Sequence, residues 1–333
     1  MDKRTLFLMA LEWRCSKHDE RITNRPGADR RGARTGHRMA VGSEPAGTTC
    51  RKRPCPGQRP RDAGLAKLPR VGVPDVWADG VAYEAYVGRW SRLVATDFVR
   101  WLDLPSALRW VDVGSGTGAV TQSLLQHASA NEVVGIDPSE GYVAYARAHV
   151  ADPGARFEVG TATALAFGDG EFDAAVSGLV LNFIPEPELA AAEMARVTRP
   201  GGTVGAYVWD YADNMQLMRH FWDAATALDP RAKELDEGVR FRLCQPGPLR
   251  TLFAGAGLTD VRVDPIDMPT RFQDFDDYWT PFLGGQGPAG NYAKSLGEER
   301  RVELRESIRA RLPYAADGSI PLVARAWAVR GTR

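Results

Sequence analysis

The chain has 333 residues, of which 44% are hydrophobic and 25% are charged, proportions typical of a globular protein rather than a disordered or fibrous one. No apolar run approaches the roughly 18–20 residues of a membrane span, and the apolar stretch Thr5–Leu11 lacks the features of a secretory signal. Four cysteines are too few for a disulfide scaffold. We therefore expect a cytoplasmic protein with no membrane span and with one large domain or two small ones.

The net charge of zero conceals an uneven distribution. Residues 1–70 contain 17 Lys and Arg against 7 Asp and Glu, so the remainder contains 25 against 35. Residues 1–70 are rich in Arg, Gly and Pro without strand or helix periodicity, and we expect a basic, disordered extension. Such an arm can bind nucleic acid, but without regularly interleaved aromatic residues we disfavour nucleic-acid binding. Its cysteines and histidines are irregularly spaced, so we expect no metal site.

From residue 71 onward the apolar residues become periodic. A helix is expected from Val76 to about Leu102, with apolar residues at three- and four-residue steps. Short apolar runs then alternate with amphipathic segments. The expected strands are Leu108–Val113, Glu132–Ile136, Arg156–Val159, Phe172–Ser177 and Thr203–Val208, and the expected helices are Ala119–Ala128, Ser139–Val150 and Glu186–Thr198. This alternation predicts a doubly wound α/β fold, a mostly parallel sheet with helices on both faces.

The most informative segment is the turn after the first strand, Asp112-Val113-Gly114-Ser115-Gly116-Thr117-Gly118. Glycines allow the backbone to turn tightly and to approach a ligand without an intervening Cβ. The following helix offers free N–H groups at its amino end. Gly114, Gly116 and Ala119 also satisfy the dinucleotide fingerprint. However, Asp112 would repel a pyrophosphate, whereas it suits the amino group of a zwitterionic ligand, and Gly118 adds a glycine at an extra position.

This turn resembles the first motif of class I S-adenosylmethionine-dependent methyltransferases. Asp137 follows Gly118 by 19 residues and stands where the family's carboxylate holds the ribose hydroxyls. The segment 160–167 resembles the family segment that borders the adenine, with Thr161 where an Asp is usual. The segment 169–177 resembles the family's fourth strand and the residues that lead into it. The segment 194–203 resembles the family's helix and turn before the fifth strand. The resemblance runs from about Val76 to Arg330 and is closest to the ubiquinone/menaquinone-biosynthesis group.

The resemblance implies S-adenosylmethionine as the cofactor. The residues expected to bind it are Asp112, Gly114, Ser115, Gly116, Thr117, Gly118, Asp137, Pro138, Ser139, Thr161, Ala162 and Ser177. Arg89 is a further candidate because its guanidinium can pair with a carboxylate, although ordinary helix packing explains it equally well. The resemblance also implies a Rossmann-like sheet of seven strands with the last one antiparallel. The candidates for strands six and seven are Asp260–Pro265 and Ile320–Val329.

The implied reaction is in-line methyl transfer to a small-molecule acceptor, in which positioning can supply about 7–11 kcal/mol. The methyltransferase domain is expected over residues 71–333. It carries two aromatic-rich insertions, about 210–245 and 267–318, which would form a pocket for an apolar or aromatic acceptor or would simply be helix core. His220 and Asp210 are candidate general bases, each with a structural role as the alternative.

Three other functions remain open on the sequence. The glycine turn nearly fits a nicotinamide-dependent oxidoreductase. The basic arm would suit an RNA or protein methyltransferase. A non-catalytic, cofactor-binding regulator would agree with Thr161 in place of the usual Asp and with the lack of a clear general base.

Overall fold

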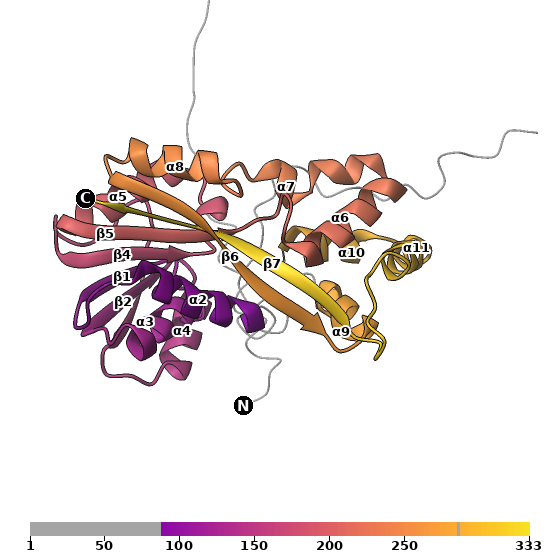
Figure 1. The fold of residues 1–333 in the computed structure, drawn as a ribbon, viewed down its shortest axis with the longest axis horizontal. Coiled ribbons are helices and arrows are strands. Elements are labelled where there is room, and N and C mark those ends of the chain that lie inside the picture. The colour runs from indigo at the N-terminus through magenta and orange to yellow at the C-terminus, as the bar shows by residue number, and fades with distance from the viewer. Residues whose placement is uncertain (1–87, 285–286) are drawn as a thin grey trace, which may run out of the picture. The chain divides into compact units, whose positions relative to one another are not determined.

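The computed structural model describes residues 88–284 and 287–333 (Figure 1). The chain divides into the units Met1–Arg59 and Pro60–Arg333, and every described residue belongs to the second. The expected basic extension 1–70 and the start of the helix expected from Val76 lie outside the described residues. Among the helices that are described, none combines the length and apolar character needed to cross a membrane.

Seven strands form one sheet in the order β3-β2-β1-β4-β5-β7-β6. Strands β1 to β5 are parallel, and β7 is antiparallel to both of its neighbours (Figure 1). The bounds are β1 Arg109–Val113, β2 Glu132–Asp137, β3 Ala155–Val159, β4 Phe172–Gly178, β5 Thr198–Trp209, β6 Thr259–Phe272 and β7 Ile320–Thr332. The expected α/β fold with a mostly parallel sheet is confirmed.

Helices cover both faces of the sheet, so most side chains of the central strands β1 and β4 are buried on both faces. The helices α2 Arg89–Leu102 and α3 Ala119–His127 bury Phe98 and Leu124 against one face. The helices α5 Pro187–Val197 and α8 Pro246–Gly255 bury Met194 and Phe253 against the other. The helix α4 Glu140–His149 lies beside α3 and packs on Phe157 of β3, with Leu125 of α3 against the same cluster.

Strands β6 and β7 continue past the end of β5. Strand β5 pairs with β7 as far as Trp209, whereas β6 pairs with β7 as far as Phe272. The sequence placed the sixth strand only over Asp260–Pro265. Pro265 and Pro269 interrupt the strand pattern, but an edge strand tolerates proline because its outward N–H groups have no partner in the sheet.

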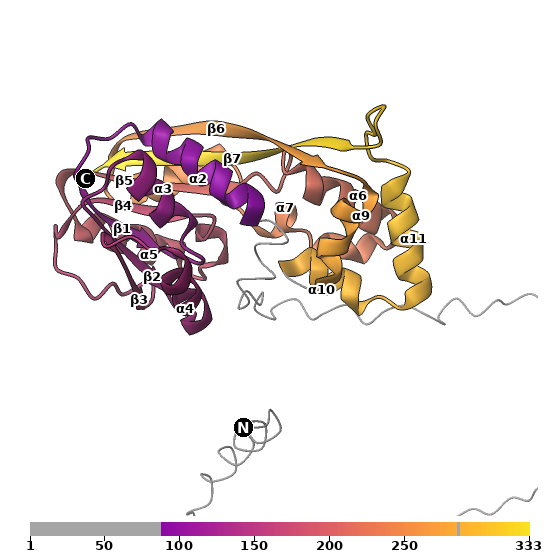
Figure 2. The same ribbon diagram turned by 90° about the horizontal axis from the view of Figure 1, so that it is seen from below.

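Helices follow β5 and β6 at the positions of the expected insertions. After β5 come α6 Gln216–Leu228, the 3₁₀ turn η3 Pro230–Glu234, α7 Glu237–Arg240 and α8. After β6 come α9 Phe275–Trp279, η4 Thr280–Gly284, α10 Gly287–Ser295 and α11 Glu298–Arg309. Figure 2 shows α6, α9, α10 and α11 gathered at the end of the β6–β7 pair that extends beyond β5. We call these four helices the hairpin layer.

Candidate active site

A cavity of about 510 Å³ lies at the carboxyl ends of β1, β2, β4 and β5. This is the edge at which open α/β sheets bind ligands, and the volume is within the range of small-molecule sites. The cavity brings together nine of the expected cofactor residues. They are Gly114, Ser115, Gly116, Thr117, Asp137, Pro138, Ser139, Thr161 and Ala162.

The glycine turn owes its shape to its glycines. Gly114, Gly116 and Gly118 have φ angles of 76°, 52° and 86°, which L-residues with a side chain rarely adopt. A Cβ on Gly114 would lie 2.6 Å from the Val180 methyls, and one on Gly118 would lie 2.8 Å from Val150. In contrast, nothing lies within 4 Å of a Cβ on Gly116, so a ligand can approach the backbone there.

Asp137 lies at the carboxyl end of β2 and lines the cavity. One carboxylate oxygen accepts from the Gly116 N–H at 3.0 Å, and the other accepts from the Ser139 N–H at 2.9 Å. Burial raises the pKa of this carboxyl, while the two backbone hydrogen bonds oppose the rise. A carboxylate has about four lone-pair sites, so the two that remain are available to a ligand.

Asp112 does not line the cavity. Its Oδ2 accepts from both the N–H and the hydroxyl of Thr121, at 3.0 and 2.7 Å, in the first turn of α3. The N-cap residue of α3 is Gly118, which has no side chain, so Asp112 satisfies a helix N–H in its place. Burial raises the pKa of Asp112 to about 7. The structure thus gives Asp112 a place beneath the glycine turn rather than beside a ligand's amino group.

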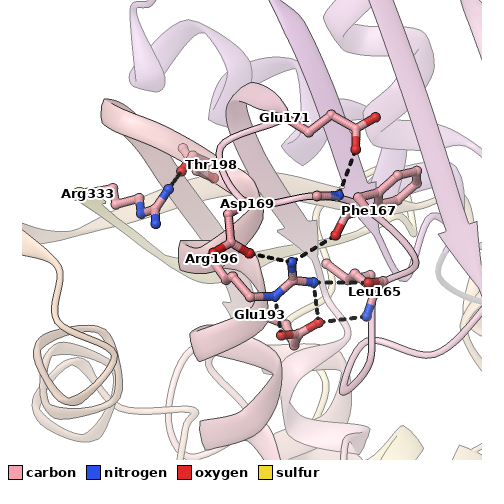
Figure 3. Close-up of polar contacts among 9 residues, drawn as sticks. Leu165, Phe167, Asp169, Glu171, Glu193, Arg196, Thr198 and Arg333 are labelled. Atoms are coloured by element: carbon pink, nitrogen blue, oxygen red, sulfur yellow. Dashed lines mark hydrogen bonds and ion pairs between the residues drawn. The ribbon is translucent and has the colours of Figure 1, made fainter.

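The loop after β3 forms a further side of the cavity through Thr161, Ala162 and Thr163. The Thr161 and Thr163 hydroxyls lie 3.1 Å apart. The next residues are held by Arg196 of α5, as Figure 3 shows: its guanidinium donates to the carbonyls of Leu165 and Phe167 and pairs with the carboxylates of Asp169 and Glu193. Glu193 in turn accepts from the Leu165 N–H at 2.8 Å. These contacts anchor the loop to α5.

Gly118, Ser177 and Arg89 also do not line the cavity. Gly118 permits close packing of α3, and Ser177 is fully buried in β4. Arg89 donates from Nη1 to Asp277 Oδ1 of α9 at 2.9 Å, and its guanidinium lies 4.2 Å from the centre of the Trp90 ring. The structure therefore directs Arg89 toward the hairpin layer.

Neither candidate base lies at the cavity. His220 is half-buried in α6, and burial lowers its pKa. Asp210 is buried and accepts from the Asp213 N–H at 3.1 Å and the Asn214 side-chain amide at 3.2 Å. These contacts hold the turn that leads from β5 into α6, which explains Asp210 without a ligand.

Sequence reasoning missed the side of the cavity formed after β4 and by Tyr207, although the first expected insertion already included Tyr211. Residues 178–180 and 183–186 line the cavity around the 3₁₀ turn η2 Leu181–Phe183, and Tyr207, Trp209 and Tyr211 line it from the end of β5. We call Phe183, Tyr207, Trp209 and Tyr211 the aromatic wall. The signal was available, since the ends of parallel strands share one edge of the sheet and β4 ends beside the glycine turn.

Most aromatic residues of the two insertions lie elsewhere. Phe221 and Trp222 of α6 and Tyr278 and Phe282 after β6 are all fully buried. The Phe221 and Phe282 rings stack with centroids 4.6 Å apart. Of the aromatic residues expected in the insertions, Tyr211 lines the cavity, and these four form the core of the hairpin layer.

Residues 111–205 match the family model described as a methyltransferase domain. A demethylmenaquinone methyltransferase of Renibacterium salmoninarum is 38% identical over 115 residues, 34% of this chain and 45% of that protein. A 2-methyl-6-phytyl-1,4-hydroquinone methyltransferase of Synechocystis sp. is 32% identical over 171 residues, 45% of this chain and 54% of that protein. A solved structure from Anabaena variabilis, described as a methyltransferase from an antibiotic biosynthesis pathway, aligns with a TM-score of 0.52 at 20% identity, covering 72% of this chain and 97% of that one.

The chain spans between 37% and 54% of the length of the curated relatives that it matches. The Anabaena structure is similar to this chain in fold. Residues 111–205 are therefore similar to a methyltransferase domain, and the seven-stranded sheet that contains them agrees in fold with the Anabaena structure.

Proposed function

We propose that this chain transfers the methyl group of S-adenosylmethionine to a small, apolar or aromatic acceptor. The proposal is carried by one observation: a single cavity joins the glycine turn and Asp137 to the aromatic wall. Neighbouring strands lie about 4.8 Å apart, so about 14 Å separate β2 from β5 along the sheet. That span leaves room for a nucleoside on one side and an acceptor on the other.

The residues on the β1–β2 side fit the cofactor. The open space at Gly116 admits its amino-acid portion close to the backbone, and the free lone pairs of Asp137 suit two vicinal hydroxyls. The Ser115 hydroxyl is buried at the cavity and has no partner among the described residues. When bound, S-adenosylmethionine supplies a methyl group on a sulfonium whose leaving group is a neutral thioether.

The aromatic wall suits a ring-bearing acceptor. Phe183 and Tyr211 both pack edge-on against the buried Phe241, with ring centroids 5.0 and 5.7 Å away, and Tyr207 lies 4.6 Å from Phe98. These contacts fix the rings before any ligand binds, which lowers the entropic cost of positioning an acceptor. The names of both methyltransferase relatives contain a quinone or hydroquinone, and we extend that class of ring to this chain.

Calorimetry with the full-length protein tests the cofactor part of the proposal. S-adenosylhomocysteine should bind and NAD should not. Binding of NAD alone would favour an oxidoreductase, and binding of neither would overturn the proposal.

A labelled-methyl experiment tests the transfer. The protein is incubated with methyl-labelled S-adenosylmethionine and a metabolite extract, and the masses of labelled products are measured. We expect a labelled small molecule, with equal yield after removal of residues 1–70. Cofactor binding with no labelled product would indicate a non-catalytic regulator. Loss of the product on removal of residues 1–70 would favour a macromolecular substrate.

A further inference from the structure

The charges that line the cavity are all of one sign. Among the described residues the lining contains no Lys, Arg or His, and its only carboxylates are Asp137 and Glu186. Asp137 lies on the β2 side, where two backbone N–H groups hold it. Glu186 lies after β4, on the same side as the aromatic wall. The acceptor side of the cavity therefore carries one negative group and no described cation.

The backbone of Glu186 is fixed, and its exposed side chain at the cavity is not used as a helix cap. Glu186 is the N-cap residue of α5, and its carbonyl accepts from the N–H groups of Leu189 and Ala190 at 3.1 and 3.3 Å. Its side chain makes no capping hydrogen bond, which agrees with the poor capping ability of Glu compared with Asp or Ser. Within residues 88–284 and 287–333 no ion pair involves it. The neighbouring Glu188, in contrast, pairs with Arg242 and does not line the cavity.

We propose that Glu186 selects the acceptor: it favours a ring that carries an O–H or N–H donor and is neutral or cationic, and it disfavours carboxylates and phosphates. This inference rests on the proposed function, because it concerns the same cavity. An aromatic wall attracts both rings and cations, and a carboxylate at its border accepts a hydrogen bond from a hydroxyl or an amine. An anionic acceptor would meet Glu186 and Asp137 with no described positive charge to offset them.

The test uses the full-length protein loaded with S-adenosylhomocysteine. Three ligands share a 4-hydroxyphenyl ring and differ in charge: tyramine is cationic, tyrosol is neutral and 4-hydroxyphenylacetate is anionic. Calorimetric titration should show both tyramine and tyrosol binding about fivefold more tightly than the anion, the upper range for an exposed charge. In Glu186→Gln the affinities for the three ligands should lie within about twofold of one another. In Glu186→Lys the anionic 4-hydroxyphenylacetate should bind most tightly of the three.

Glu188→Lys is the matched control, since it makes the same change in net charge on an exposed residue of the same helix that does not line the cavity. It should keep the wild-type order of affinities. The inference is overturned if the wild type binds the anion as well as tyrosol, if none of the three ligands binds, or if Glu186→Lys keeps the original order. Failure of S-adenosylhomocysteine to bind the wild type would instead count against the proposed function.

Discussion

The cavity and the hairpin layer both combine aromatic rings with carboxylates, but they use them in opposite ways. In the hairpin layer, two buried aromatic side chains that carry polar atoms both have partners: Trp222 Nε1 donates to Glu237 of α7, and the Tyr278 hydroxyl donates to the Leu217 carbonyl at 2.8 Å. At the cavity, the buried Ser115 hydroxyl has no partner among the described residues, and the exposed Glu186 side chain makes no capping hydrogen bond.

A buried polar group without a partner at the cavity is a signal that residue type alone does not give. A buried polar group without a partner costs about 1–3 kcal/mol, so folded proteins satisfy such groups unless a ligand or water will do so. Aromatic rings carry no such signal, since they serve a core and a pocket equally well. Substitutions in the hairpin layer and at the cavity should therefore affect stability and ligand binding differently.

The largest effect is expected from Trp222→Ala in the hairpin layer. Trp222 is fully buried, and its removal should leave a cavity and take a donor from Glu237, lowering the free energy of unfolding by about 3–5 kcal/mol. Urea denaturation measures this, with the exposed Val239→Ala as the control. S-adenosylhomocysteine should bind the folded variant within about twofold of the wild type. Unchanged stability with lost acceptor binding would show that Trp222 belongs to the site.

The next effect concerns Asp112 beneath the glycine turn. Because the folded state raises its pKa from 3.8 to about 7, the folded protein binds more protons than the unfolded chain between these values. Asp112 therefore makes its full contribution to the free energy of unfolding below about pH 4. This contribution, at most about 4 kcal/mol, is lost as the pH rises toward 7. Asp112→Asn should remove this fall, so that its stability relative to the wild type is greater at pH 8 than at pH 5.

Asp173→Asn is the control for that experiment. Hydrogen bonds from Arg109 and Arg199 lower the pKa of Asp173, so its contribution changes only below about pH 4. Urea midpoints at pH 5 and pH 8 should shift equally in this variant. The same equal shift in Asp112→Asn would contradict the buried environment assigned to Asp112.

Asp137→Asn tests the polar side of the cavity. A neutral amide can accept from only one of the Gly116 and Ser139 N–H groups and loses the charge-assisted bonds expected with the ribose. The affinity for S-adenosylhomocysteine should fall about 10- to 100-fold in calorimetry. Glu188→Gln, which removes the same charge outside the cavity, should leave it unchanged. An affinity within twofold of the wild type in Asp137→Asn would remove Asp137 from the site.

The fold was predictable from local signals. The glycine turn after a buried strand and the alternation of strands and helices predicted β1 to β4 to within a residue, whereas β5 begins five residues before the expected Thr203. The length of β6 was not predictable from the sequence. Pro265 and Pro269 argue against a strand, but β6 is an edge strand that pairs with β7 beyond the end of β5 and tolerates both prolines. Strand pairing is a tertiary effect that sequence periodicity does not report.

The site was predictable on one side only. Asp137 and Gly116, which line the cavity, could be proposed from the sequence because backbone geometry and strand ends dictate their positions. His220 was a candidate because histidine is a common base, yet its helix faces the hairpin layer's core. Glu186 was missed because a glutamate before a proline at the start of a helix looks like an ordinary helix start; only the cavity shows what it borders.

The smallest effect is expected from Arg89→Ala, at the point where the two regions meet. Ser91 of α2 lines the cavity, whereas Arg89 pairs with Asp277 of the hairpin layer. Because this pair is partly exposed, its loss should cost at most about 1 kcal/mol. The affinity for S-adenosylhomocysteine should stay within about twofold in both Arg89→Ala and Asp277→Ala. A tenfold loss in Arg89→Ala alone would mean that this guanidinium leaves Asp277 to bind the cofactor's carboxylate, and that α2 serves the cavity through Arg89 as well as Ser91.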